Sequence, residues 1–417
     1  MAHRTRPSWL LLPPSTYLLT VVLWLFYLAL GMGTPLLSLL FEARGLTLAQ
    51  IGWASAVFNS AGLLANLLVG RWLDSSAGRR PFVAAGLLGL GLAGVGFYWA
   101  TGLALIFLFQ ALAGITVAIY TTSSQALIGD YTERSAGRGK VLAGYRMGGS
   151  LTFTLGAMVT GPIAERFGLP VPILLAGGLW FAAGILSLFL PRPRRALATD
   201  RQAPAIRPEP LSPQPDEAPQ EFTRPLGPFL VAGFLWWAAF MGVSAIWPNY
   251  AARIGFSPTT IGNLHALAAF LEVPFMMAAG YLADRFGRLT LMSSGLFVYG
   301  GVCLLWAFLP MLGGFILAQI ARGYAFATME VTTTVYAVEA GGDARRGKVV
   351  SYYQATGSLG RIAGTTGAGN LAQLLGFVPM LVTATGVSWL AGLLLLPASR
   401  KEKIGVPGPA SPAEAVE

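Results

Sequence analysis

Charged residues placed inside long apolar stretches are the feature of this sequence best suited to chemistry. Only two of its 18 acidic residues, Glu272 and Glu330, lie in such stretches, together with the basic residues Arg146, Arg322 and Arg361. An ionisable group is costly to remove from water, so those that persist in apolar surroundings are candidates for binding a solute or carrying a proton. The alternative is that they form fixed salt bridges between helices.

Glu272 and Arg361 occupy matching places in their stretches. Each lies about 14 residues into a predicted helix, over 258–283 and 347–375, and therefore near its middle. Glu272 could exchange a proton for a solute hydroxyl. Arg361 could pair with Glu272 or hold a solute through two parallel hydrogen bonds. His265, seven residues before Glu272, shares its face and could titrate near neutrality, although a lone histidine is more often a packing residue.

Uncharged polar side chains recur at helical spacing and could complete such a site. An amide both donates to and accepts from hydroxyl groups, but polar side chains also join membrane helices to one another, so both interpretations stay open. Arg322 and Glu330 are eight residues apart, about 80° around one helix, which disfavours their direct pairing. Ser150 follows Arg146 by four residues. The neutral candidates are Asn59, Gln110, Gln125 and Gln354, with Ser55, Asn66, Thr121, Ser358 and Thr365 on the same faces.

Composition indicates which elements position these residues. The 417-residue chain is 54% hydrophobic with a mean hydropathy of +0.62, and only 11% of it is charged, against about 25% in soluble domains. Its apolar runs lack strand alternation, and at about 20 residues they match a helix that crosses a bilayer. The sequence predicts an all-α polytopic membrane protein of about twelve helices, over 17–40, 50–73, 81–101, 103–128, 139–165, 170–190, 226–250, 258–283, 290–309, 312–338, 347–375 and 377–397.

The helices divide into two sets of six. We expect an N-terminal half over 1–190, a linker over 191–228, a C-terminal half over 229–398 and a tail over 399–417. The linker is rich in proline, arginine and acidic residues and has no apolar period, which predicts disorder. The N-terminus lacks a small-residue cleavage site, so the first helix is expected to remain uncleaved.

The basic residues predict the topology. Of the 28 lysines and arginines, 22 lie in the termini, the linker or alternate loops, and Arg44, Arg166 and Arg253 lie on the other side. Positively charged loops favour the cytoplasm, so both termini and the linker of this multi-pass protein are expected there. The net charge of +10 is then a topology signal and does not indicate nucleic-acid binding.

Several function classes are disfavoured. One cysteine, Cys303, and two histidines make a structural metal site improbable, and we expect no metal and no cofactor. No phosphate-binding loop and no nucleophile–histidine–acid set is evident, so we expect neither an ATPase nor another enzyme. The expected partners are a small solute, protons and the lipid bilayer, with the chain a monomer.

An internal repeat relates the two halves. Residues 138–168 align without gaps to residues 346–376, with 12 identities in 31 positions. Two parallel halves of this kind imply a binding site between them, near the middle of the membrane. Glu272, Arg361 and Arg146 align with Gly62, Phe153 and Gln354, so the charges do not follow the repeat.

A loop motif links the sequence to a known family. The segment from Gly280 to Arg288 resembles the signature between the second and third helices of each half of the major facilitator superfamily. The copy from Gly70 to Arg80 holds one extra residue, and Ser75 replaces the usual basic residue. The resemblance implies a twelve-helix transporter in which this loop is a cytoplasmic latch; the alternative is a tight charged turn. The latch residues would be Gly70, Asp74, Arg79, Gly280, Asp284, Arg285, Gly287 and Arg288.

The stretch from Leu271 to Arg288 is similar to the bacterial sugar-efflux subgroup of that superfamily. This similarity implies a protein of the bacterial inner (plasma) membrane that exports sugars or glycosides, driven by inward proton movement. Drug–proton antiporters usually carry an arginine where this chain has Gln110, and paired glycines follow their Gly-Pro where this chain has Ile163 and Ala164. Proton-coupled export of a small polyhydroxylated solute is therefore predicted, with multidrug efflux and proton-coupled uptake as the alternatives.

Overall fold

The computed structural model describes residues 14–75, 79–132, 138–191 and 225–404, and the described residues form twelve α-helices. The predicted all-α membrane fold is confirmed. The helices are α1 Pro14–Gly33, α2 Leu37–Ala43, α3 Leu48–Ser75, α4 Arg80–Trp99, α5 Leu103–Thr132, α6 Arg138–Phe167, α7 Pro170–Ser187, α8 Leu226–Arg253, α9 Pro258–Phe286, α10 Arg288–Phe308, α11 Leu312–Leu375 and α12 Phe377–Ile404. The predicted linker and tail lie largely outside the described residues.

Two boundaries differ from the expected helices. The first predicted helix is interrupted at Thr34–Pro35, so α1 and α2 are separate, because the proline ring cannot continue the hydrogen-bond ladder. Two other predicted helices run together as α11, where Gly342 alone has non-helical dihedrals, with φ 54° and ψ −165°. We call residues 312–341 and 343–375 the first and second arms of α11. Counting α1 with α2 once and α11 twice gives twelve passes.

Nine described segments are long and apolar enough to cross a membrane. Those outside this set are α6 and both arms of α11, which are the helices that carry Arg146, Arg322, Glu330 and Arg361. Their low hydropathy follows from these charges and from many Gly and Thr residues. Polar side chains in a membrane face protein or a water-filled space, because lipid cannot satisfy them.

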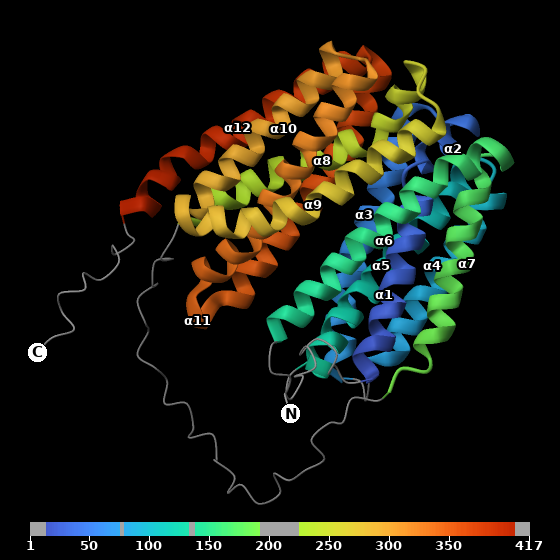
Figure 1. The fold of residues 1–417 in the computed structure, drawn as a ribbon, viewed down its shortest axis with the longest axis horizontal. Helices are drawn as coiled ribbons and strands as arrows, with labels where there is room; N and C mark the ends of the chain where they lie inside the picture. Colours follow the sequence, from blue (N-terminus) through green and yellow to red (C-terminus); the bar gives the residue numbers. More distant parts are fainter. Residues whose placement is uncertain (1–13, 76–78, 133–137, 192–224, 405–417) are drawn as a thin grey trace, which may run out of the picture.

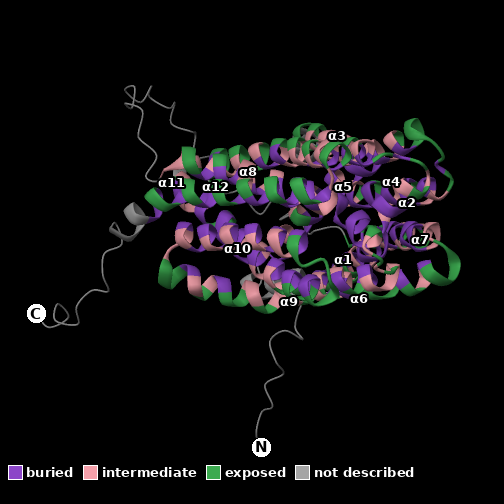
Figure 2. Ribbon diagram, turned by 90° about the horizontal axis from the view of Figure 1, so that it is seen from above, coloured by how far each residue is buried: buried purple, intermediate pink, exposed green. Residues whose placement is uncertain are grey.

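The helices form two groups, α1–α7 and α8–α12, which we call the first and second halves (Figure 1). We call the end of the molecule at Pro14, Ser187 and Leu226 the linker end, and the end at Arg44 and Gly376 the distal end. In each half the buried positions follow the inward faces of the helices and the exposed ones the outward faces (Figure 2). This is the pattern of a bundle whose outer surface is solvated by lipid.

The halves are in close contact at the distal end. A Cβ atom added to Gly161 of α6 would lie 2.2 Å from Cα of Thr259 in α9. A Cβ atom added to Gly52 of α3 would lie 2.4 Å from the carbonyl oxygen of Thr365 in α11. Two helix backbones can approach each other this closely only where a glycine, which has no Cβ atom, lies at the contact, as in other packed membrane helices.

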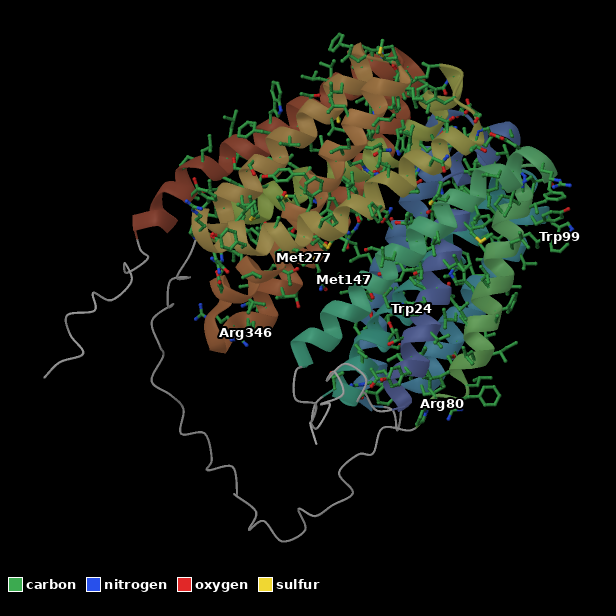
Figure 3. All side chains as sticks on the ribbon, viewed as in Figure 1. Trp24, Arg80, Trp99, Met147, Met277 and Arg346 are labelled. Atoms are coloured by element: carbon green, nitrogen blue, oxygen red, sulfur yellow. The ribbon has the colours of Figure 1, made fainter. Side chains whose placement is uncertain are left out.

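Toward the linker end the same helix pairs diverge. The helices α6 and α9 run antiparallel, so continued contact would bring Met147 within about one helical turn of Met277. Both are instead exposed, by 38% and 68%, on facing sides of the two halves (Figure 3). In α3, Leu64 and Leu67 are likewise 62% and 64% exposed. The molecule is closed at its distal end and open at its linker end.

Candidate functional site

Four of the five charged residues predicted from the sequence gather in the second half. Glu272 of α9 is half-buried, and Arg322 and Glu330 of the first arm of α11 lie within electrostatic range of it. Arg361 comes from the second arm and is also within electrostatic range of Glu330. Three membrane passes thus bring two acids and two bases into one cluster, which we call the charge cluster.

Arg322 is the most deeply placed of these charges, with 9% exposure. Its Nη1 donates to Oε1 of Gln319, one turn earlier, at 3.3 Å, and its guanidinium lies 5.1 Å from the ring centroid of Phe240 in α8. A buried guanidinium needs an anion to balance it. Glu272 is an acid whose ionisation Arg322 influences, so the two residues are electrostatically coupled.

Arg361 is held by an aromatic ring. Its guanidinium carbon lies 4.2 Å from the Trp237 ring centroid, and its Nη2 donates to Oγ of Ser358 at 3.4 Å. The Trp237 indole N–H donates in turn to the Tyr353 hydroxyl at 3.3 Å. Cation–π contacts of this kind are favourable where water is excluded. In this arrangement the Arg361 guanidinium keeps N–H donors that could bind a solute.

The suggested pairing of Arg361 with Glu272 is not found among the described residues. Arg361 lies against Trp237 of α8, while the cation that acts on Glu272 is Arg322. The spacing along the sequence predicted that both residues lie near the middle of the membrane. It could not predict the rotation of each helix about its axis, which decides which side chains meet.

The aromatic residues beside the cluster are packed inside the second half. Trp247 and Tyr250 are 1% and 8% exposed, so they do not belong to an aromatic belt at the membrane interface. Trp247 stacks on His265 at 4.6 Å between ring centroids and on Trp306 at 5.4 Å. His265 Nδ1 also lies 3.2 Å from the carbonyl oxygen of Ile261. These contacts favour a packing role for His265.

The amide residues have different surroundings. Gln110 of α5 is 5% exposed and lines a pocket, whereas Gln125 and Gln354 are exposed. Asn59 donates to the carbonyl oxygen of Ser55 at 2.7 Å, and Asn66 accepts from the Thr122 hydroxyl at 2.9 Å. The first bond stays within α3, whereas the second joins α3 to α5, as polar side chains often do between membrane helices. Arg146 belongs to α6, but its side chain lies outside the described part of the structure.

The loop motifs at the linker end form matching ion pairs in the two halves. Nη1 of Arg79 lies 2.5 Å from Oδ1 of Asp130 in α5, and Nη2 of Arg288 lies 3.3 Å from Oε1 of Glu339 in the first arm of α11. Arg288 also pairs with Asp284 at 2.8 Å. These two ion pairs of Arg288 stay within the second half.

The other loop residues complete these turns. Gly287, with φ 89°, ends α9 in a conformation that favours glycine. Gly280 has open space where a side chain would begin, and Arg285 lies over the adjacent Phe286 ring. Gly70 and Asp74 belong to α3, and their environments lie outside the described side chains.

The distal end carries contacts that the sequence reasoning missed. Oε1 of Glu42 in α2 lies 2.7 Å from Nη2 of Arg253 in α8, and Asn249 Nδ2 donates to Oε2 of Glu42 at 2.6 Å. Glu165 of α6 accepts from the backbone N–H of Thr259, at the start of α9, at 2.9 Å. All these bonds cross between the halves, and we call them the distal gate. One feature of the sequence could have indicated this gate. Glu42, Glu165 and Arg253 are charged residues at the helix ends that otherwise carry few charges.

Comparisons with known proteins agree with this architecture. The family model of the Major Facilitator Superfamily matches residues 19–255 and 229–415. A Deinococcus radiodurans protein named "Putative sugar efflux transporter" is 26% identical over 94% of this chain and all of its own length. The maltose permease of Geobacillus stearothermophilus is 26% identical over 80% of this chain and 82% of that protein.

Solved structures show the same fold. The nucleoside transporter NupG superposes with a TM-score of 0.76 at 14% identity, covering 93% of this chain and 99% of NupG. A bacterial homologue of the human lysosomal transporter Spinster, inward-facing and occupied, gives 0.76 at 15% identity, covering 95% and 98%. With twelve membrane passes in two halves and a family match over most of its length, this chain belongs to the major facilitator superfamily of secondary transporters and is not an enzyme.

Proposed function

We propose that this transporter exports a small polyhydroxylated solute, a sugar or a glycoside, in exchange for protons. The two halves would rock about the charge cluster and expose it to each side of the membrane in turn. Both termini and the linker would lie in the cytoplasm of a bacterial cell, as the distribution of basic residues predicts.

The observation that carries the proposal is the position of Glu272. It is a half-buried acid in the middle of a membrane helix, coupled to the buried Arg322, and it has a second acid, Glu330, in range. When Glu272 is ionised it balances Arg322, and when it takes a proton Arg322 loses that balance. Arg322 would then turn to another acceptor, such as Glu330 or a solute hydroxyl. Proton and solute would thus compete through one cluster, which is the linkage that exchange requires.

The groups around Arg361 support the proposed substrate class. An aromatic face, a tyrosine hydroxyl and a guanidinium fork meet at Trp237, Tyr353 and Arg361. Sugars present apolar ring faces and many hydroxyls, so they suit aromatic surfaces with polar handles. The names of the two relatives, a sugar efflux transporter and a maltose permease, support the same class.

The arrangement of the halves is compatible with export. With the termini in the cytoplasm, the open linker end faces the cytoplasm and the distal gate closes the outer side. In this arrangement, a solute to be exported would reach the charge cluster from the cytoplasm. Opening of the distal gate, together with closure of the linker end, would release it.

Proton movement in energised inside-out vesicles tests the proposal. A pH-sensitive dye inside the vesicles would report proton release when glucose, maltose or lactose is added. We expect release with at least one sugar, loss of that release in Glu272→Gln, and its retention in Glu414→Gln, which removes an acid after the last helix. A response only to cationic drugs would instead identify a multidrug antiporter. Sugar movement together with protons, in the same direction, would identify an uptake permease.

A further inference from the structure

A polar pocket lies apart from the charge cluster, at the distal side of the contact between the halves. It has a volume of about 110 Å³, and residues of both halves line it. Thr34, Ser38, Ser55 and Gln110 come from the first half, and Ser244 and Pro248 come from α8 in the second. All of its lining side chains are uncharged, so it suits a neutral occupant.

Two of its hydroxyl groups have no partner. Most buried hydroxyls in the described helices donate to a carbonyl oxygen about one turn earlier, as Thr116 and Ser123 do. The hydroxyls of Ser38 and Ser244 are buried and make no hydrogen bond. A buried hydroxyl without a partner costs free energy, so such groups are satisfied by a ligand or by water.

The backbone of α8 adds an acceptor to the same wall. Pro248 lies inside α8 and has no N–H, so it cannot donate to the carbonyl oxygen of Ser244, four residues earlier. In a membrane helix a freed carbonyl of this kind is tolerated where another polar group can satisfy it. Both residues line the pocket. The wall at Ser244 therefore offers a hydroxyl and a carbonyl oxygen together.

Gln110 adds hydrogen-bonding groups to the pocket from the first half. Its side chain is 5% exposed, and an amide supplies both donors and an acceptor. Paired donors and acceptors on two facing walls match a hydroxylated group and do not favour an ion. The volume exceeds that of one water molecule several-fold, which leaves room for part of a solute.

We propose that this pocket is a substrate subsite that binds the uncharged, hydroxyl-bearing part of the solute, with Gln110 and Ser244 as its specificity-determining residues. The inference rests on the proposed function and extends it. The rest of the solute would reach toward the charge cluster. Because the pocket draws on both halves, its occupant also bridges them on the side of the distal gate.

Direct binding to the purified, full-length protein tests the subsite separately from proton exchange. Isothermal titration would measure the affinity for glucose, maltose and sorbitol in the wild type and in Gln110→Leu and Ser244→Ala. The matched control is Thr116→Val, which alters a buried polar residue of α5 that does not line the pocket. Size-exclusion profiles and melting temperatures would establish that each variant is folded.

We expect at least one of these probes to bind, its affinity to fall about 5- to 10-fold in Gln110→Leu and in Ser244→Ala, and Thr116→Val to bind as the wild type does. Unchanged affinity in both pocket variants, or no binding of any probe to the wild type, would overturn the subsite. Binding that depends on Gln110 without proton release in vesicles would support the subsite and reject proton exchange. Proton release that depends on Glu272, combined with unchanged affinity in both pocket variants, would do the reverse.

Discussion

Glu42 and Arg253 form an ion pair of 2.7 Å that joins the two halves of the molecule at the distal end. The Arg253 guanidinium also lies 5.1 Å from the centre of the Phe377 ring, so α2, α8 and α12 meet there. Both charges are partly exposed, and such pairs contribute little each. A gate built from several weak bonds can open and close at low cost, which suits a molecule that alternates between two arrangements.

Removing the acid of this pair should favour opening of the distal end. In Glu42→Gln we expect the distal-open population to rise about 1.4- to 5-fold, since a partly exposed ion pair contributes about 0.2–1 kcal/mol. Cys303 is the only cysteine and is buried, so spin labels on cysteines introduced at Thr101 and Leu312 would report the distance cleanly.

The control for that experiment removes a charge at the same end without breaking a bond between the halves. Arg166→Gln serves, because the Arg166 guanidinium lies over the neighbouring ring of Phe167. Equal distance distributions in wild type and Glu42→Gln would contradict the role of the pair.

A single methyl group should disrupt the closed distal end. In Gly161→Ala the new Cβ would meet the Thr259 backbone at 2.2 Å, which no side-chain rotation can relieve. We expect solute transport to fall at least about tenfold, because the halves cannot close fully. Gly178→Ala is the matched control, since a Cβ there has nothing within 4 Å. Transport at the wild-type rate in Gly161→Ala would show that the halves need not come this close.

The two linker-end ion pairs should act independently. Arg79–Asp130 and Arg288–Glu339 occupy equivalent places in different halves. We expect Arg79→Gln and Arg288→Gln each to lower stability by about 0.5–1.5 kcal/mol, and the double variant to show the sum, because distant sites add. Melting temperatures in detergent would measure this. A clear departure from the sum would mean that the halves are energetically coupled at this end.

The contact of Arg361 with Trp237 should matter for solute affinity. Lysine keeps the charge but lacks the planar fork, so Arg361→Lys should weaken sugar binding by about 3- to 30-fold. Trp237→Leu should weaken it similarly, and the double variant should lose less than the product of the two. Titration of maltose into each variant would test this. Full affinity in Arg361→Lys would leave Arg361 with a purely structural role.

Arg44 should stabilise the first half without taking part in transport. It donates to the carbonyl oxygens of Phe97, Tyr98 and Ala100 at the end of α4. Partial burial lowers the pKa of Arg44 from its usual value, but a guanidinium stays charged at neutral pH. Arg44→Gln should lower stability by about 1–3 kcal/mol, read as a lower melting temperature, with the affinity for sugar unchanged. A lost affinity at normal stability would contradict this assignment.

Much of the fold could be predicted because lipid imposes a simple rule on the chain. Every backbone polar group in the membrane must be bonded within its own helix, so length and hydropathy locate most of the passes, although not α6 and the two arms of α11. Glycines with positive φ, such as Gly168, Gly255 and Gly376, then end or follow the helices near the expected places. The repeat and the loop motif identified the family for the same reason, since both are properties of consecutive residues.

Contacts between helices could not be predicted in this way. Glu272 and Arg361 lie at similar depth, yet Arg361 rests on Trp237 while Arg322 acts on Glu272. Which long side chains meet depends on the rotation of each helix about its axis and on where neighbours allow close approach. The inward packing of Trp247 has the same origin.

The sequence by itself determined that this protein is a membrane transporter with ionisable residues at mid-membrane, because hydropathy and the placement of charge are local properties. Only the tertiary structure decided that Glu42 meets Arg253 and that Gln110 faces Ser244. These pairs come from opposite halves, more than a hundred residues apart in the chain. Their proximity follows from how the two halves pack, which no spacing along the sequence encodes.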